Sequence, residues 1–169
     1  MKKSLLLLPS LLFLVACQDN NCVIKESNFF LVMTNILYYP EDYLNKDLSL
    51  DCFTYNVTDI NDVNYLCGVR KCTAGYGCRC GKDSVIGFIL NYDGNIPEPK
   101  NQYDDTNDKS WIHIAGKLSS KDKTNIKMYS YDAEGNKTDT VEEIQFLSFD
   151  VTTLEIVTDY SNLHYFVSK

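Results

Sequence analysis

Residue types on which many enzyme and nucleic-acid sites depend are scarce in this chain of 169 residues. It has two histidines, His113 and His164, and neither lies in a motif typical of a zinc site or an activated nucleophile. Hydrolytic catalysis therefore has little support, and no enzyme activity is expected. The formal net charge of −7 repels phosphate backbones, so nucleic acid is not expected as a partner.

Long apolar runs are also scarce, with one exception at the N-terminus. Lys2 and Lys3 precede an apolar run over residues 5–16, a pattern typical of a secretory signal and too short to span a bilayer. The run closes with LVAC, which resembles the lipobox of bacterial lipoproteins. That resemblance implies cleavage before Cys17 and attachment of diacylglycerol to its thiol. The alternative is an ordinary signal peptide with a cysteine nearby by chance.

The lipobox resemblance sets the expected organisation of the chain. Residues 1–16 are expected to be a lipoprotein signal peptide, residues 17–26 a polar tether, and residues 27–169 a single OB-like β domain. Two acyl chains hold a protein stably on a bilayer. The mature protein is therefore expected in the bacterial cell envelope, lipid-anchored through Cys17 and outside the cytoplasm.

The periodicity of apolar residues changes near residue 46. Phe29, Val32, Met33 and Ile36 have helical spacing and predict a helix over 28–37, which Pro40 ends. Later residues form short alternating runs rich in β-branched and aromatic side chains, which predict strands. The expected strands cover 47–57, 62–70, 84–92, 110–119, 125–132 and 140–158, the last as two strands or one bent strand. The fold class is therefore predicted as mainly β, a small closed or nearly closed barrel of five or six strands with an N-terminal helix; the family resemblance given below implies that this barrel is OB-like.

A long polar loop over residues 93–110 joins two of these strands. Loops of this length in a compact domain are usually functional or disordered. Its oxygen-bearing side chains could hold a hard cation such as Ca²⁺, and the alternative is a solvated acidic loop. The residues concerned are Asp104, Asp105, Asn107 and Asp108.

Tyrosines could line a groove for a sugar or a peptide, since barrels of this kind bind oligosaccharides on one face. Strand propensity and helix packing explain the same tyrosines without a ligand. They are Tyr38, Tyr39, Tyr43, Tyr55 and Tyr65. His113 alternates with Ile112 and Ile114 and is therefore expected on the solvent face of its strand. Trp111 is expected to pack in the core.

Residues 28–120 resemble the extracytoplasmic domain of YcgQ-like small subunits of two-component permeases. The matching residues are Tyr43, Lys46, Phe53, Gly87, Trp111 and Gly116. The resemblance implies an OB-type barrel that works with a membrane permease subunit. Where that family has adjacent cysteines, this chain has Cys72 followed by an insertion that contains Cys78 and Cys80.

Six cysteines remain if Cys17 carries lipid, an even number that favours disulfides outside the cytoplasm. They are Cys22, Cys52, Cys67, Cys72, Cys78 and Cys80. Zinc or copper is the alternative, although the C-x4-C-x5-C-x-C spacing of the last four is not the C-x2-C pair typical of structural zinc. Thiol redox chemistry is a further alternative, because Lys71, Arg79 and Lys82 could lower a thiol pKa.

Three functions follow from these patterns. The first is a membrane-anchored binding or accessory subunit that works with a permease, either without a cofactor or with a metal at the cysteines. The second is a disulfide-stapled structural or surface-interaction module. The third is a thiol redox protein that uses the cysteine cluster.

Overall fold

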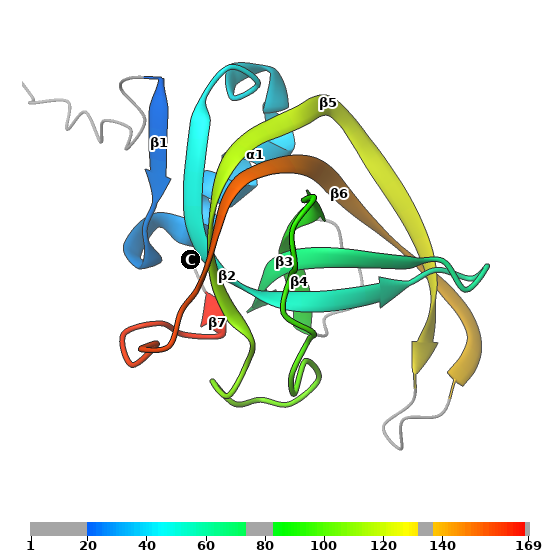
Figure 1. The fold of residues 1–169 in the computed structure, drawn as a ribbon. Coiled ribbons are helices and arrows are strands. Elements are labelled where there is room, and N and C mark those ends of the chain that lie inside the picture. Colours follow the sequence, from blue (N-terminus) through cyan, green and yellow to red (C-terminus); the bar gives the residue numbers. More distant parts are fainter. Residues whose placement is uncertain (1–19, 74–82, 132–136, 168–169) are drawn as a thin grey trace, which may run out of the picture.

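The computed structural model describes residues 20–73, 83–131 and 137–167 and is mainly β, as predicted (Figure 1). Two single turns of 3-10 helix, η1 and η2, flank the one α-helix in this part of the chain. In chain order the elements are β1 (Asn21–Ile24), η1 (Glu26–Asn28), α1 (Phe29–Tyr38), η2 (Pro40–Asp42), β2 (Asp47–Thr58), β3 (Asn64–Thr73), β4 (Asp83–Asn91), β5 (Trp111–Tyr131), β6 (Lys137–Ile156) and β7 (Phe166–Val167).

Five strands close into a ring. β2 pairs with both β3 and β5, and the ring continues from β5 to β6, from β6 to β4 and from β4 back to β3. β4 and β6 run parallel, whereas the other contacts of the ring are antiparallel. Closure of the ring pairs the strand edges that an open sheet would leave exposed. The predicted small barrel with an N-terminal helix is therefore confirmed.

Two short strands cover a gap where β2 and β3 separate. β3 pairs with β2 only over Asn64–Val69, so the start of β2 and the end of β3 are not hydrogen-bonded to each other. β1 pairs with β2 at Asp47–Leu50, and β7 pairs with β3 at residues 71–72, both in parallel. The segments before and after the barrel thus meet at the same gap.

β1 corrects the expectation of a free polar tether over residues 17–26. Residues 21–24 are a strand of the sheet, and Cys22 and Ile24 are 0% and 2% exposed. The alternation of NCVI turns these two side chains into the core, while the free edge of β2 supplies the main-chain hydrogen bonds. The folded domain therefore begins before residue 27.

The helix prediction holds, and two strand predictions change. α1 buries the apolar stripe predicted for it, Phe29, Val32, Met33 and Ile36. The strands expected at 110–119 and 125–132 are one continuous strand, β5, with an irregular register between Leu118 and Lys123. The polar sequence between them looked like a turn, but β6 pairs with β5 on both sides of it. β6 is one bent strand, and the chain end forms the short strand β7.

Two apolar clusters pack against opposite faces of the β3–β4 pair. The first contains α1, β1 and alternate residues of β4, such as Ile86 and Phe88. The second contains Cys67, Val69 and Trp111, with Ile89 of β4 packed against it. Successive side chains of a strand point to opposite faces, so the odd-numbered residues Cys67 and Val69 of β3 face the second cluster and Cys72 faces the first. β3 therefore lies between two buried layers. No residue from 67 to 72 on β3 is exposed.

Gly116 is required by a close approach of two strands. A Cβ atom there would lie 2.0 Å from the carbonyl oxygen of Asp150, at the bulge where β5 shifts register against β6. Bulges let a long strand bend enough to close a small barrel.

Candidate interaction site

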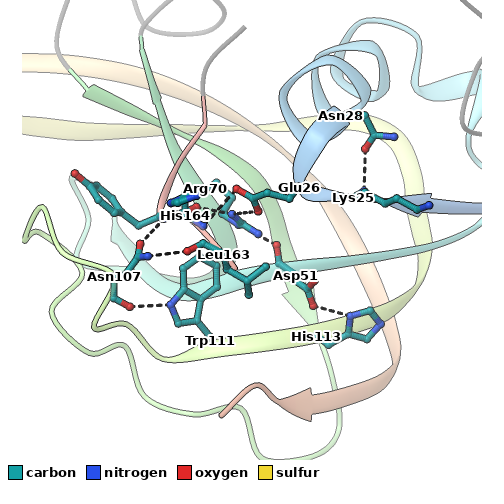
Figure 2. A network of polar contacts seen from close by, with 11 residues as sticks. Lys25, Glu26, Asn28, Asp51, Arg70, Asn107, Trp111, His113, Leu163 and His164 are labelled. Carbon is teal, nitrogen blue, oxygen red and sulfur yellow. Dashed lines mark hydrogen bonds and ion pairs between the residues drawn. The ribbon is translucent and has the colours of Figure 1, made fainter. Parts of the chain in front are cut away.

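Arg70 lies at the gap between β2 and β3 and is only 1% exposed. Its Nε donates to the carbonyl oxygen of Asp51 on β2 at 3.0 Å, and its Nη1 donates to Glu26 Oε2 at 2.8 Å and to the carbonyl oxygen of His164 (Figure 2). Glu26 follows β1, and His164 precedes β7. One guanidinium therefore joins the separating strand, the N-terminal segment and the C-terminal segment.

The surroundings of Arg70 are aromatic as well as polar. Its guanidinium carbon lies 4.5 Å from the centre of the Trp111 ring and 4.9 Å from that of Phe29. A planar guanidinium can stack on rings and donate in its plane at once, which an ammonium group cannot do. Glu26 is 31% exposed, so it compensates the buried charge from the rim of the site.

Two buried lysines fix the long loop over 93–110: Lys71 of β3 ties it to the barrel, and Lys109, within the loop, folds it on itself. Lys71 Nζ donates to Asp105 Oδ1 at 2.9 Å and to the carbonyl oxygen of Tyr103 at 3.1 Å. Lys109 Nζ, in a side chain 4% exposed, donates to the carbonyl oxygens of Asn101 and Asp104. Both ammonium groups thus satisfy carbonyl oxygens of the loop, which fixes the path of its main chain.

The charge states of these groups follow from their surroundings. Burial lowers the pKa of Lys109, and the neighbouring charge of Lys71 lowers it further. The hydrogen bond and the charge of Lys71 lower the pKa of Asp105. Both ammonium groups also lie near the Tyr165 ring, at 5.7 and 5.6 Å from its centre.

Asn107 ties the loop to the chain end (Figure 2). Its Nδ2 donates to the carbonyl oxygen of Leu163 at 2.7 Å, and its Oδ1 accepts from the Tyr165 amide at 2.8 Å. Its carbonyl oxygen accepts from Trp111 Nε1 at 2.8 Å. These three bonds satisfy both ends of one side chain and the indole donor of the buried tryptophan.

Two acidic residues of the loop are paired with the chain's own cations. Asp105 binds Lys71, and Asp108 lies 2.6 Å from Lys100 Nζ and accepts from Asn101 Nδ2 at 2.9 Å. Within the described residues, no group of three or more acidic, histidine or cysteine side chains is placed to hold a metal ion. Asp105 and Asp108 therefore have protein partners in place of a metal ion.

The structure places the described candidate cysteines in two different apolar clusters. Cys22, Cys52 and Cys72 lie in the first apolar cluster and Cys67 in the second. Cys22 is disulfide-bonded, whereas Cys52 and Cys67 are free thiols, which corrects the expectation of disulfides at these two positions. Residues 67 and 72 are separated by an odd number on one strand, so they face opposite layers. Cys17, Cys78 and Cys80 lie outside the described residues.

Burial also makes the two free thiols poor redox groups. Both side chains are 0% exposed, and loss of solvation raises the pKa of each to about 12. The nearby charge of Arg70 opposes this shift at Cys52 without cancelling it. Because the thiolate is the reactive form, neither thiol is activated at neutral pH.

The remaining sequence candidates have ordinary structural roles or lie apart. His113 is on the outer face of β5, as predicted, where its Nδ1 lies 2.8 Å from Asp51 Oδ1. Tyr55 and Tyr65 pack against the second cluster, while Tyr38 and Tyr39 are exposed at the end of α1. The five tyrosines do not form one groove. OB barrels commonly bind oligosaccharides through their second and third strands, which correspond to β3 and β4 in this ring. Here apolar clusters pack against both faces of the β3–β4 pair.

Sequence reasoning missed Arg70 and Lys109, and it considered Lys71 only as a neighbour of the cysteines rather than as a buried cation that holds the loop. The signal was present, because RK interrupts the apolar run of β3 and Lys109 stands two residues before the only tryptophan. A charged residue in the middle of an otherwise apolar strand is buried only when it has partners. Arg70 and Lys71 find those partners in segments distant in the sequence, whereas Lys109 binds carbonyl oxygens of its own loop.

The fold and this set of contacts define a small closed β-barrel domain with an N-terminal helix and a loop fixed by buried cations. Residues 13–145 match the family described as the DUF1980 C-terminal domain, so the chain belongs to that family. No curated protein and no solved structure matches the chain significantly. None of the helices in the described ranges has the length and apolar character needed to cross a membrane.

Proposed function

We propose that the mature protein is a lipid-anchored lipoprotein of the bacterial cell envelope whose barrel is a binding or accessory subunit for a membrane protein. The LVAC sequence before Cys17 supports the anchor. The resemblance of residues 28–120 to YcgQ-like permease subunits supports a permease as the partner. Membership of the DUF1980 C-terminal domain family is compatible with this role and does not specify it.

The fixed loop over 93–110 is the observation that carries the binding role. Two buried ammonium groups and Asn107 hold its main chain, yet Tyr103 within it is 75% exposed. The Tyr103 ring packs edge-on against Tyr55 at 5.9 Å, which orients it. A loop that is ordered before binding loses less conformational entropy when a partner docks. Exposed, oriented tyrosines are frequent in protein interfaces.

The chemistry of the described residues favours binding over the thiol redox alternative. Cys52 and Cys67 are buried with pKa values raised to about 12. Redox-active thiols are instead accessible and have a lowered pKa.

Photo-crosslinking in intact cells tests the binding role. p-Benzoylphenylalanine in place of Tyr103 should yield an adduct with a membrane protein of the permease type. The same group in place of Val63, which is 47% exposed on the β2–β3 turn, is the matched control and should not. If neither position, or both equally, gives an adduct from folded protein, the loop is not the binding surface.

Fractionation tests the anchor separately. The Cys17→Ser protein should move from the membrane fraction to the soluble fraction of the envelope, because it can no longer receive diacylglycerol. Unchanged detergent partitioning would exclude the anchor while leaving the crosslinking result valid.

The disulfide of Cys22 supports a second candidate function, a stapled structural module with no partner. A disulfide at Cys22 places a covalent constraint on β1, and small secreted domains are often stabilised in this way. On this alternative, Cys22→Ser lowers the unfolding temperature and the Tyr103 probe finds no partner.

A further inference from the structure

α1 has an outer face without charge. Its ten residues, FFLVMTNILY, include no acidic or basic side chain, although a surface helix normally carries them on its solvent side. Leu31 is 65% exposed and Tyr38 is 47% exposed. The seven-residue separation of these two places them on the same face, opposite the buried stripe.

Tyr39 extends this face beyond the end of the helix. It is 57% exposed, and its ring centre lies 6.3 Å from that of Tyr38. Leu31, Tyr38 and Tyr39 are called the α1 outer face below. A leucine beside a pair of tyrosines is a composition found where a helix lies in the interface of a bilayer, with aromatic rings at the headgroup level.

The α1 outer face ends where the chain enters the domain. The carbonyl oxygen of Asn20 accepts a hydrogen bond from the Asp47 amide at 2.7 Å, and Asn21 is paired with Asp47. Asp47 begins β2, with four residues between it and η2, which follows Tyr39. In Figure 1 the start of β1 and the turns that join α1 to β2 lie at the same upper end, whereas the loop over 93–110 lies at the lower end.

The spacing along the chain brings this end close to the proposed anchor. Cys17 stands three residues before Asn20. A fully extended chain spans at most about 3.6 Å per residue, so these two Cα atoms are separated by no more than about 11 Å. A lipid on Cys17 would therefore hold the end of α1 at the surface of the bilayer.

We infer that the α1 outer face docks on the bilayer interface and fixes the orientation of the barrel, an inference that rests on the proposed lipid anchor. Exposed acidic residues next to this face, Glu41 and Asp42, disfavour an anionic surface, so the lipid it fits is zwitterionic. The loop over 93–110 then points away from the lipid toward a partner.

The experiment uses the mature protein purified from membranes and reconstituted into vesicles of phosphatidylethanolamine and phosphatidylcholine. p-Benzoylphenylalanine replaces Leu31 in one sample and Tyr39 in another. Tyr103, an exposed aromatic on the loop over 93–110 that packs against Tyr55, is the matched control position. Lipid adducts are quantified by mass spectrometry after irradiation, and circular dichroism checks that each variant is folded.

Lipid adducts at positions 31 and 39 should exceed those at position 103 by about tenfold, since burial of an apolar side chain favours the inserted state by roughly that factor or more. The excess should persist at high salt, because charge does not hold this face. Equal yields at all three positions, loss of the excess in salt, or adducts of position 31 mainly with a second protein molecule would overturn the inference.

The N-terminal peptide from the same samples reports the anchor independently. If it carries lipid and the adduct yields are equal, the anchor is real and the docking face is wrong. If it carries no lipid, the anchor is wrong, and the adduct ratio still decides whether the α1 outer face meets the bilayer.

Discussion

Replacing Arg70 by methionine should destabilise the domain more than any other single loss of a cation. Methionine has a similar length but no donors. The carbonyl oxygens of Asp51 and His164 would then lose their donor in a part-buried site, and each acceptor left unsatisfied costs about 1–3 kcal/mol. The lost contact with the Trp111 ring adds about 1 kcal/mol. We expect a fall of about 4 kcal/mol in the free energy of unfolding.

Urea denaturation measures this effect. Trp111 is the only tryptophan and is 1% exposed beside Arg70, so its fluorescence reports the site directly. With a slope of about 2 kcal/mol per molar urea, the midpoint should fall by about 2 M. Lys117→Met is the matched control, because Lys117 is half exposed and only 3.5 Å from Asp47, and it should change stability by less than about 0.5 kcal/mol.

The result that would refute this reasoning is equal stability of the two variants. A fall of less than about 1 kcal/mol for Arg70→Met would mean that water or neighbouring groups satisfy the exposed carbonyls, contrary to the buried geometry. Amide exchange adds a local test, since β1 and β7 should lose protection before the strands of the ring.

The remaining predictions concern thiols, backbone packing and pH. The thiols of Cys52 and Cys67 should react with Ellman's reagent at pH 8 only after unfolding, and rapid labelling of the native protein would contradict this. The free energy of unfolding should decline as pH rises from about 9 toward 12, because the folded state keeps these two thiol protons while the unfolded state releases them. Gly116→Ala should lower stability by about 2 kcal/mol or more through collision with a carbonyl oxygen, measured against Ala115→Gly; equal midpoints for both would count against the close approach. The stabilising contribution of Asp105 is present above its unfolded pKa near 4 and is lost as pH falls through its lowered folded pKa, so Asp105→Asn should weaken the acid dependence of stability; an unchanged acid transition would argue against the pair with Lys71.

Much of the barrel could be predicted because its strands and helix carry their periodicity locally. The buried stripe of α1 and the alternation of β2 are readable from short windows of sequence. β1 could not be predicted in this way. Its four residues form a strand only because β2 and β3 separate and leave an edge, which is a property of the closed ring.

The candidate site was less predictable because its partners are distant in the sequence. Arg70 is satisfied by groups 19, 44 and 94 residues away, so no local pattern distinguishes it from a surface arginine. The cysteines show the opposite case. Residues 67 and 72 are separated by an odd number of positions on one strand, so their side chains must point to opposite faces of β3. This could be predicted from the sequence once both residues are assigned to the same strand.

The two short strands at the gap also govern how copies of this protein behave toward one another. β1 and β7 occupy main-chain donors and acceptors on β2 and β3 that would otherwise face solvent. Unoccupied edges of this kind recruit strands from other molecules. A protein shortened to begin at residue 27 would therefore carry a vacant edge beside Arg70, which residues 21–24 of a neighbouring full-length chain could fill by strand exchange.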